Sequence, residues 1–144
     1  RLGKGGRRFK IYKFRTMIDD HQGHIWTTGD DKRLTFIGKS LRYTHLDELP
    51  QLINILKRDV SFIGPRPERK ELAELYSQLP YYEIRHIIKP GLTGWAQVNY
   101  KASASIEEAK EKLQYDIYYI KNRSLILDLL ILLKTIRYLF TSNG

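Results

Sequence analysis

The sequence of 144 residues contains no cysteine. Disulfide bonds, thiolate metal sites and a catalytic cysteine are therefore excluded, which fits a reducing compartment. The chain also lacks a signal peptide and any run of about 20 uninterrupted apolar residues, so no membrane-spanning helix is predicted. Because it begins with Arg1 rather than methionine, we expect a fragment from which an upstream segment has been removed.

Acidic residues are scarce relative to basic ones. The chain carries 16 Asp and Glu against 25 Lys and Arg, which gives a formal net charge of +9 at pH 7. This balance implies an anionic partner. Charge alone leaves three classes open: nucleic acid, an anionic membrane surface and a phosphorylated substrate.

The chain has enough apolar material for one core, since 42% of its residues are hydrophobic. Its length predicts a single domain that spans residues 1–144. The predicted fold class is α+β, mainly helical, with a small N-terminal β-hairpin or short strands.

Two segments are predicted as strands. Residues 9–14 nearly alternate between apolar and basic or aromatic side chains, which indicates a strand that pairs with the residues before it in a hairpin. Residues 95–99 are predicted as a last short strand.

Hydrophobic periodicity predicts the remaining elements as helices, at residues 37–44, 49–56, 67–82, 106–120 and 125–140. Ser105 and Glu108 form a capping box at the start of the fourth helix. The last helix is apolar nearly all round, which is typical of a helix that is buried in a core or lies in a membrane interface. The residues leave these two alternatives open.

Two patterns that suggest ligand sites are interpreted otherwise. Gly38-Lys39-Ser40 resembles the end of a phosphate-binding P-loop, but the glycine required five residues earlier is replaced by Arg33. His21 and His24 lie in a polar stretch with several acids, which we interpret as a solvated loop rather than a metal site.

An adjacent pair of acids, Asp47 and Glu48, lies between Arg42 and Arg66. Pro50 suits the first turn of a helix, so both carboxylates are expected at or just before a helix N-terminus, where positive partial charge favours ionised acids. One interpretation is that the pair only caps this helix. The other is a site that handles a phosphate through a metal, because a rigid Gly-Pro-Arg-Pro turn presents Arg66 in a fixed direction.

Five motifs follow one another along the chain. They are Lys13-Phe14-Arg15-Thr16-Met17, Asp47-Glu48-Leu49-Pro50-Gln51-Leu52, Gly64-Pro65-Arg66-Pro67, Lys89-Pro90-Gly91-Leu92-Thr93-Gly94-Trp95-Ala96-Gln97-Val98-Asn99 and Tyr115-Asp116. In this order they resemble the bacterial sugar transferase family, the monotopic polyprenyl-phosphate phosphoglycosyl transferases. The resemblance runs from about Lys4 to about Thr135, nearly the whole chain.

The resemblance implies an enzyme that uses Mg²⁺ to move a sugar phosphate from a nucleotide diphospho-sugar, with UDP as the expected nucleotide, onto polyprenyl (undecaprenyl) phosphate. It implies that Asp47 attacks the sugar-linked phosphorus and forms a phosphosugar-aspartate, which the lipid phosphate then attacks. Glu48 would assist by proton transfer or by supporting the metal, and both acids are expected metal ligands. Arg42 and Arg66 would hold phosphate.

The resemblance also implies further substrate-binding residues, namely Lys13, Arg15, Lys89, Gly91, Thr93 and Asp116. The residues themselves leave a structural alternative for Asp116, a salt bridge within the fold. The implied setting is a membrane surface, the cytoplasmic face of the bacterial inner membrane, during assembly of an exopolysaccharide, capsule, O-antigen or glycoprotein glycan. The oligomeric state is not predicted.

The chain departs from the family pattern in two places. Many members have a glycine before the Asp of a Gly-Asp-Met-Ser segment, where this chain has Arg58-Asp59-Val60-Ser61, so we expect this turn to differ locally. Members also carry an upstream membrane-embedded helix, and some a multi-span region, which residues 1–144 lack. A basic nucleic-acid-binding module is the alternative function, but no known binding signature is present, and no nucleic-acid partner is predicted.

Overall fold

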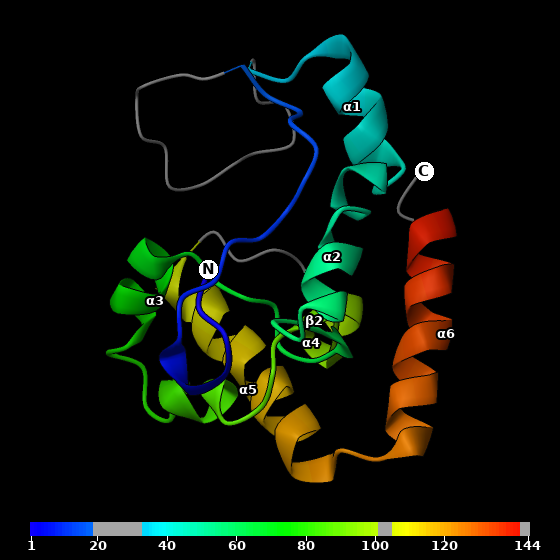
Figure 1. Cartoon of the computed structure of the whole chain (residues 1–144). Helices are drawn as coiled ribbons and strands as arrows, with labels where there is room; N and C mark the ends of the chain where they lie inside the picture. Colours follow the sequence, from blue (N-terminus) through cyan, green and yellow to red (C-terminus); the bar gives the residue numbers. More distant parts are fainter. Residues whose placement is uncertain (19–32, 101–104, 142–144) are drawn as a thin grey trace.

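A computed structural model of the chain describes residues 1–18, 33–100 and 105–141 (Figure 1). Within these ranges the chain is mainly helical with one small parallel sheet, so the predicted fold class is confirmed. The elements in chain order are η1 (Lys4–Gly6), α1 (Phe36–Tyr43), η2 (Leu46–Glu48), α2 (Gln51–Leu56), β1 (Ser61–Ile63), α3 (Lys70–Tyr76), η3 (Tyr82–His86), β2 (Gly91–Thr93), α4 (Trp95–Asn99), α5 (Ile106–Asn122) and α6 (Leu125–Thr141). The stretch with His21 and His24 lies outside the described residues.

The core lies between α3 and α5 and includes the segment that leads from α3 into η3. Its buried side chains are Leu72, Ala73, Tyr76, Leu79, Tyr82, Ala109 and Leu113. The start of α5 agrees with the predicted capping box, because the Ser105 hydroxyl oxygen accepts a hydrogen bond from the Glu108 amide at 3.2 Å. Helix α5 also contacts η3 and α4, the elements that precede and follow β2 in the chain.

The sheet joins two turns that the sequence separates by about 25 residues. Strands β1 and β2 pair in parallel, with Ser61 opposite Gly91. The Gly91 amide donates to the Pro65 carbonyl at 2.9 Å, and a Cβ at Gly91 would overlap the Gly64 amide nitrogen. Only glycine permits this approach, so the sheet holds the Gly-Pro-Arg-Pro turn against the Lys-Pro-Gly segment.

The strand predicted at residues 9–14 is not formed. The Tyr12 amide donates to Asn54 Oδ1 at 3.0 Å, and Asn54 Nδ2 donates to the Lys10 carbonyl at 2.7 Å. The Phe14 amide donates to the Asp47 carbonyl at 3.0 Å. A side-chain amide and a turn carbonyl therefore take the hydrogen bonds that a partner strand would otherwise provide.

The other predicted β elements also differ from the structure. The N-terminal hairpin is reduced to a single antiparallel bridge between Leu2 and Arg8. Residues 95–99, predicted as a strand, form the helix α4, in which the Asn99 side chain donates to the Trp95 carbonyl at 2.8 Å. The strand of this region is β2, which ends at Thr93.

Helix α3 is shorter than the predicted helix at residues 67–82. The chain is still extended at Arg69, and the Ser77 hydroxyl donates to the Glu74 carbonyl at 2.6 Å, where the helix ends. Tyr81 then adopts a left-handed conformation with φ of 65°, which turns the chain into η3. A competing side-chain hydrogen bond and a left-handed residue thus divide what the periodicity presents as one helix.

The turn after α2 keeps a conformation that favours glycine although it carries Arg58. The φ of Arg58 is 62°, in the left-handed region, and the Asp59 amide donates to the Asn54 carbonyl at 3.0 Å to close the helix end. Left-handed residues are common at this position, but a side chain there costs about 1 kcal/mol relative to glycine. Arg58 therefore holds a backbone conformation that glycine adopts at lower cost.

Helix α2 exposes its apolar side chains and buries its polar ones. Leu52 and Leu56 are 44% and 83% exposed, whereas Gln51 and Asn54 are 3% and 0% exposed. Helix α6 likewise carries exposed leucines and isoleucines over most of its length, with Ile131 fully buried, and it runs along one side of the molecule (Figure 1). Among the helices that the structure describes, none combines the length and the apolar character needed to cross a bilayer.

Candidate active site

The acid pair lies in the short turn η2, directly before α2. His45 adopts a left-handed conformation with φ of 55°, which reverses the chain after α1. The Glu48 amide donates to the His45 carbonyl at 3.1 Å and closes the turn. The acids thus occupy the place that the sequence predicts, just before a helix N-terminus.

Glu48 is the centre of a charged cluster. Its Oε1 accepts hydrogen bonds from Lys13 Nζ at 2.5 Å and from an Arg66 guanidinium nitrogen at 2.9 Å. Burial alone would raise the pKa of Glu48, but these two cations outweigh burial and lower the pKa to about 2. Glu48 is therefore ionised at neutral pH.

Asp47 is 8% exposed and differs from Glu48 in its surroundings. Among the described residues, none donates a hydrogen bond to its carboxylate. The Asp47 charge nevertheless acts on Lys13 and Arg66, whose pKa values it helps to raise against burial. Asp47 therefore offers a carboxylate that lies near two cations and is not hydrogen-bonded to either of them.

Two distant segments deliver the cations. Lys13 lies in the extended segment that Asn54 and the Asp47 carbonyl hold in place. Burial lowers the pKa of Lys13, and the Glu48 charge opposes this effect. Arg66 lies in the turn after β1, and its carbonyl accepts a hydrogen bond from Arg85 at 3.0 Å. The site therefore depends on contacts between residues that are far apart in the sequence.

Among the hydrogen bonds and ion pairs of the described residues, none joins Arg42 to the acid pair. Its guanidinium donates to Thr16 Oγ1 and to Met17 Sδ, each at 3.0 Å. Arg42 therefore joins α1 to the Lys-Phe-Arg-Thr-Met motif. Arg15 of the same motif is exposed. The predicted phosphate-binding and substrate-binding roles of these two arginines remain predictions.

Asp116 lies in a buried ion pair. Its Oδ2 accepts a hydrogen bond from Arg85 at 2.9 Å, and the two side chains are 3% and 5% exposed. Arg85 also approaches Glu68 at 3.6 Å, and Glu68 accepts from Lys112 at 2.9 Å. The structural alternative for Asp116, a salt bridge, is thus present, and it links α5 to the Arg66 turn.

The other predicted substrate-binding residues lie along β2 and the segment before it. Lys89 lines a pocket beside β1, and Gly91 pairs with Ser61 in the sheet. The Thr93 and Thr135 hydroxyls are hydrogen-bonded at 2.7 Å, which connects β2 to α6. Among the described residues, none of these three forms a hydrogen bond to either carboxylate of the acid pair.

Two residues that position the site were not identified from the sequence. Asn54 is fully buried and positions the segment of Lys13. Its signal was a lone amide between Ile53 and Ile55 in an apolar helix. Arg85 is 6% exposed and holds the Arg66 carbonyl. Hydrophobic periodicity gave no signal for Arg85, because this residue lies in the short element η3 rather than in a long helix.

The carboxylates of the acid pair fit a magnesium ion that takes its other ligands from water and a bound substrate. Both cations bind Oε1 of Glu48, which leaves Glu48 Oε2 and the Asp47 carboxylate without a donor among the described residues. Mg²⁺ typically takes one or two carboxylates and completes its shell with water and phosphate oxygens. Within the described ranges, no group of three or more acidic or histidine side chains is placed to hold a metal.

An acid pair balanced by cations from separate segments defines a site suited to phosphate chemistry. The bacterial sugar transferase family matches residues 1–142, and the chain belongs to this family. The predicted family resemblance is thereby confirmed.

Curated relatives carry related activities in their names. The chain is 46% identical to a UDP-N-acetylgalactosamine-undecaprenyl-phosphate N-acetylgalactosaminephosphotransferase of Aeromonas hydrophila, over 100% of this chain and 35% of the relative. It is 42% identical to the uncharacterized sugar transferase EpsL of Bacillus subtilis, over 100% of the chain and 69% of the relative. It is 38% identical to the UDP-glucose:undecaprenyl-phosphate glucose-1-phosphate transferase of Escherichia coli, over 94% of the chain and 30% of the relative. The chain thus spans about a third of the length of the first and third of these relatives.

Proposed function

We propose that this chain is the catalytic part of a phosphoglycosyl transferase, which moves a sugar phosphate from a UDP-sugar to undecaprenyl phosphate. The names of relatives from Aeromonas hydrophila and Escherichia coli support the donor and acceptor classes. The relatives named exopolysaccharide production proteins support a role in the first membrane step of polysaccharide assembly.

The observation that carries this proposal is the contrast between the two acids. Glu48 is bonded to Lys13 and Arg66, whereas the neighbouring Asp47 carboxylate has no hydrogen-bond donor among the described residues. A carboxylate free of donors keeps its lone pairs for attack, and adjacent cations reduce the repulsion of an anionic substrate.

In the proposed reaction, an Asp47 oxygen forms a bond to the sugar-linked phosphorus while the bond from that phosphorus to the UMP oxygen breaks. UMP leaves, and an oxygen of undecaprenyl phosphate then attacks the same phosphorus and releases Asp47. Lys13 and Arg66 hold developing negative charge through this sequence. Mg²⁺, held by Asp47 and Glu48, would neutralise the donor phosphates.

The proposed location is the membrane surface at the cytoplasmic face of the inner membrane. The exposed apolar side chains of α2 and α6 support it, since soluble proteins rarely leave such surfaces open. Flotation with liposomes tests this part. Leu52→Ser with Leu56→Ser should reduce recovery with vesicles, and exchange of the exposed polar pair Lys110→Gln and Glu107→Gln should not.

The activity is tested with the full-length protein and a panel of UDP-sugars. Release of UMP that depends on undecaprenyl phosphate for multiple turnovers supports the proposal. A salt-dependent gel-shift assay on DNA and RNA tests the alternative, a nucleic-acid-binding module. Tight nucleic-acid binding without UMP release from any donor would refute the transferase.

A further inference from the structure

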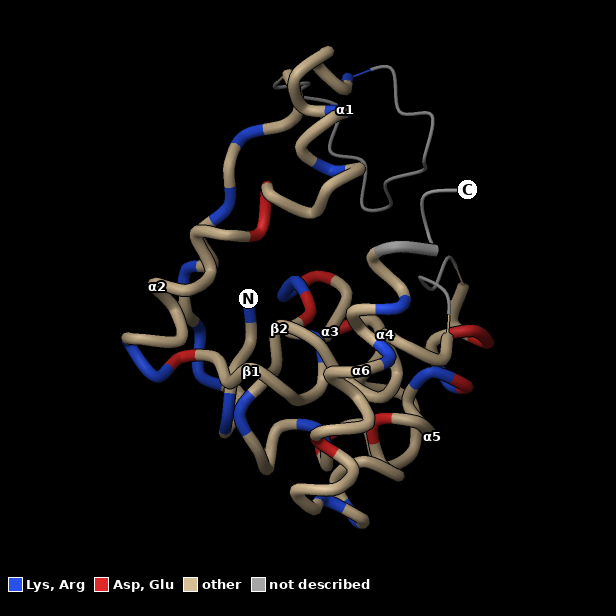
Figure 2. Tube along the Cα trace, turned by 90° about the vertical axis from the view of Figure 1, so that its right-hand side faces the viewer, with Lys and Arg blue, Asp and Glu red and all other residues tan. Residues whose placement is uncertain are grey.

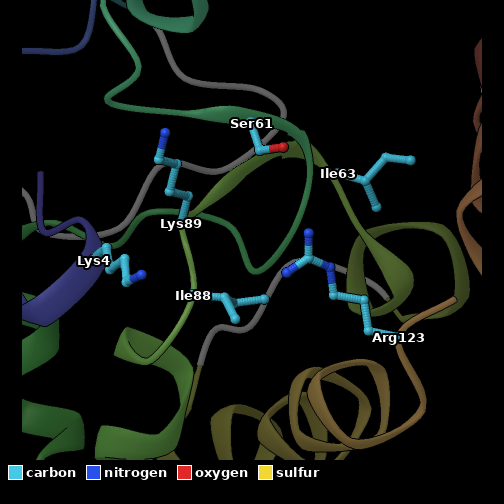
Figure 3. A pocket seen from close by; sticks show the side chains of 6 residues that line it. All are labelled: Lys4, Ser61, Ile63, Ile88, Lys89 and Arg123. Atoms are coloured by element: carbon cyan, nitrogen blue, oxygen red, sulfur yellow. The ribbon is translucent and has the colours of Figure 1, made fainter.

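A pocket of about 320 Å³ lies beside the sheet (Figure 3). Its lining residues are Lys4, Ser61, Ile63, Ile88, Lys89 and Arg123. None of the acids and cations around Glu48 lines it. This volume is at the lower end of the range for sites that bind small molecules, roughly 300–1,000 Å³.

The pocket is lined by positive charge without a matching carboxylate. Lys4, Lys89 and Arg123 reach it from η1, from the segment before β2 and from the end of α5 (Figure 3). Among the described residues, neither Lys4 nor Lys89 forms an ion pair. Further Lys and Arg residues lie on the backbone segments beside β1 (Figure 2). Like charges held together without counter-charges favour an anionic ligand.

Arg123 is exposed and lies beside the Tyr119 hydroxyl. It follows α5 directly, and its guanidinium interacts with the hydroxyl of Tyr119, which is 2% exposed. Burial raises the pKa of Tyr119, and its bond to Asp128 at 2.8 Å adds to the increase, while Arg123 opposes it. The Tyr119 hydroxyl therefore lies next to the one guanidinium that lines the pocket.

The remaining lining supplies a hydroxyl and two apolar walls. Ser61 lies on β1, where its amide donates to the Pro90 carbonyl, so its backbone is fixed. Ile63 follows on the same face of the strand, and Ile88 lies opposite (Figure 3). Cations together with a small apolar surface suit a phosphate group attached to an organic body.

We propose that this pocket is a second anion site, which binds a phosphate monoester through Lys4, Lys89 and Arg123 and packs the organic part of the ligand on Ile63 and Ile88. A soluble nucleotide and the head group of an anionic lipid share this chemistry. The inference does not depend on the acid pair, because none of its residues lines the pocket. Lys89, for which the family resemblance implies substrate binding, is left unchanged in the test.

Equilibrium dialysis with the detergent-solubilised full-length protein tests the inference. The probes are UMP, inorganic phosphate and dihexanoyl phosphatidic acid, each over a range of salt concentrations. The pocket variant combines Lys4→Gln with Arg123→Gln. The matched control combines Lys39→Gln with Lys110→Gln, two exposed lysines outside the pocket that change the net charge equally. A third protein, Arg66→Gln, alters the acid-pair cluster alone.

We expect two kinds of site, the acid-pair cluster and the pocket. The dissociation constant of the pocket site should rise about tenfold or more in the pocket variant and stay unchanged in both the control and Arg66→Gln. If UMP binds more tightly, the ligand is a soluble nucleotide. If the short-chain phosphatidic acid binds more tightly, the ligand is an anionic lipid head group. The inference is overturned if no probe binds saturably, if the control loses affinity equally, or if all binding depends on Arg66. Transfer activity is measured in parallel, so that loss of the pocket's binding with normal UMP release separates this inference from the proposed function.

Discussion

Arg85 and Asp116 form an ion pair at 2.9 Å inside the protein, with both side chains 5% exposed or less. The same guanidinium group donates to the Arg66 carbonyl at 3.0 Å, and Arg66 in turn bonds to Glu48. Burial alone would lower the pKa of Arg85, but the charges of Asp116 and Glu68 raise it, so the guanidinium stays protonated. A chain of polar contacts thus runs from α5 to the acid pair.

This relationship predicts the effect of Asp116→Asn. The substitution keeps the shape of the side chain and removes its charge, while Glu68 remains near Arg85. We expect a loss of roughly 1–3 kcal/mol in the free energy of unfolding, together with a lower kcat, because the Arg66 turn loses its support. Urea unfolding and steady-state kinetics measure the two effects.

The control for this experiment is Lys70→Gln, which breaks an exposed pair with Glu74 and should change neither quantity. A raised KM with an unchanged unfolding free energy would instead indicate direct substrate binding by Asp116, the role that the family resemblance implies. A positioning role is supported if stability and kcat fall together and KM stays constant.

Acid should destabilise the protein through two carboxylates. Burial alone would raise the pKa values of Glu48 and Glu68, but neighbouring cations lower both from 4.5 to about 2. A group whose pKa is lower in the folded state stabilises the fold fully above its unfolded pKa. This contribution is lost as the pH falls from about 4.5 towards about 2.

Chemical denaturation at a series of pH values across this window measures the effect. Glu48→Gln should flatten the dependence of the unfolding free energy on pH, because one of the two titrating groups is removed. Glu74→Gln, at an exposed position, should leave the dependence unchanged. An identical slope in the wild type and Glu48→Gln would contradict the stabilising role of the Lys13 and Arg66 contacts.

The sequence predicted local features well, because they depend on neighbouring residues. The position of Asp47 and Glu48 before a helix follows from Pro50 and the apolar spacing after it. The cap at Ser105 follows from a hydroxyl and an acid three residues apart. Both features need no information about the rest of the fold.

The remaining features depend on contacts that sequence periodicity does not contain. Periodicity shows that α2 has an apolar face, but the structure turns the other face inward, since Asn54 bonds a distant extended segment. The same bonds explain why residues 9–14 form no strand. The Gly-Pro-Arg-Pro turn indicated that Arg66 is held rigidly, yet its neighbour Arg85, 19 residues later, had no local signal.

Arg66 should not be replaceable by lysine. The Gly-Pro-Arg-Pro turn, the paired strands and the Arg85 bond fix the direction of its side chain. A guanidinium can bond Glu48 and a phosphate oxygen at once, while an ammonium cannot do so with the same geometry. Arg66→Lys should lose most of the activity and keep its fold, and near-normal turnover would count against the assigned role.

Arg42→Lys provides the comparison. Arg42 bonds Thr16 and Met17 rather than the acid pair, so its replacement should act through the packing of α1. We expect a loss of activity in this variant that is smaller and is accompanied by reduced stability. Circular dichroism and UMP release, measured on both variants, separate the two cases.

Asp47, rather than Glu48, should become bonded to phosphorus. Glu48 is bonded to two cations, whereas the Asp47 carboxylate has no hydrogen-bond donor among the described residues and is therefore the better nucleophile. With a UDP-sugar and Mg²⁺ but without lipid acceptor, the wild type should release UMP in an amount limited by the enzyme. Its intact mass should increase by one phosphosugar.

Two nearly isosteric variants test this assignment. Asp47→Asn should remain folded and show neither UMP release nor the added mass, because the amide is not nucleophilic. Glu48→Gln weakens the hold on Lys13 and Arg66, so it should form the adduct slowly rather than not at all. If peptide mapping placed the phosphosugar on any other residue, or if Asp47→Asn still accumulated it, the covalent role of Asp47 would be wrong.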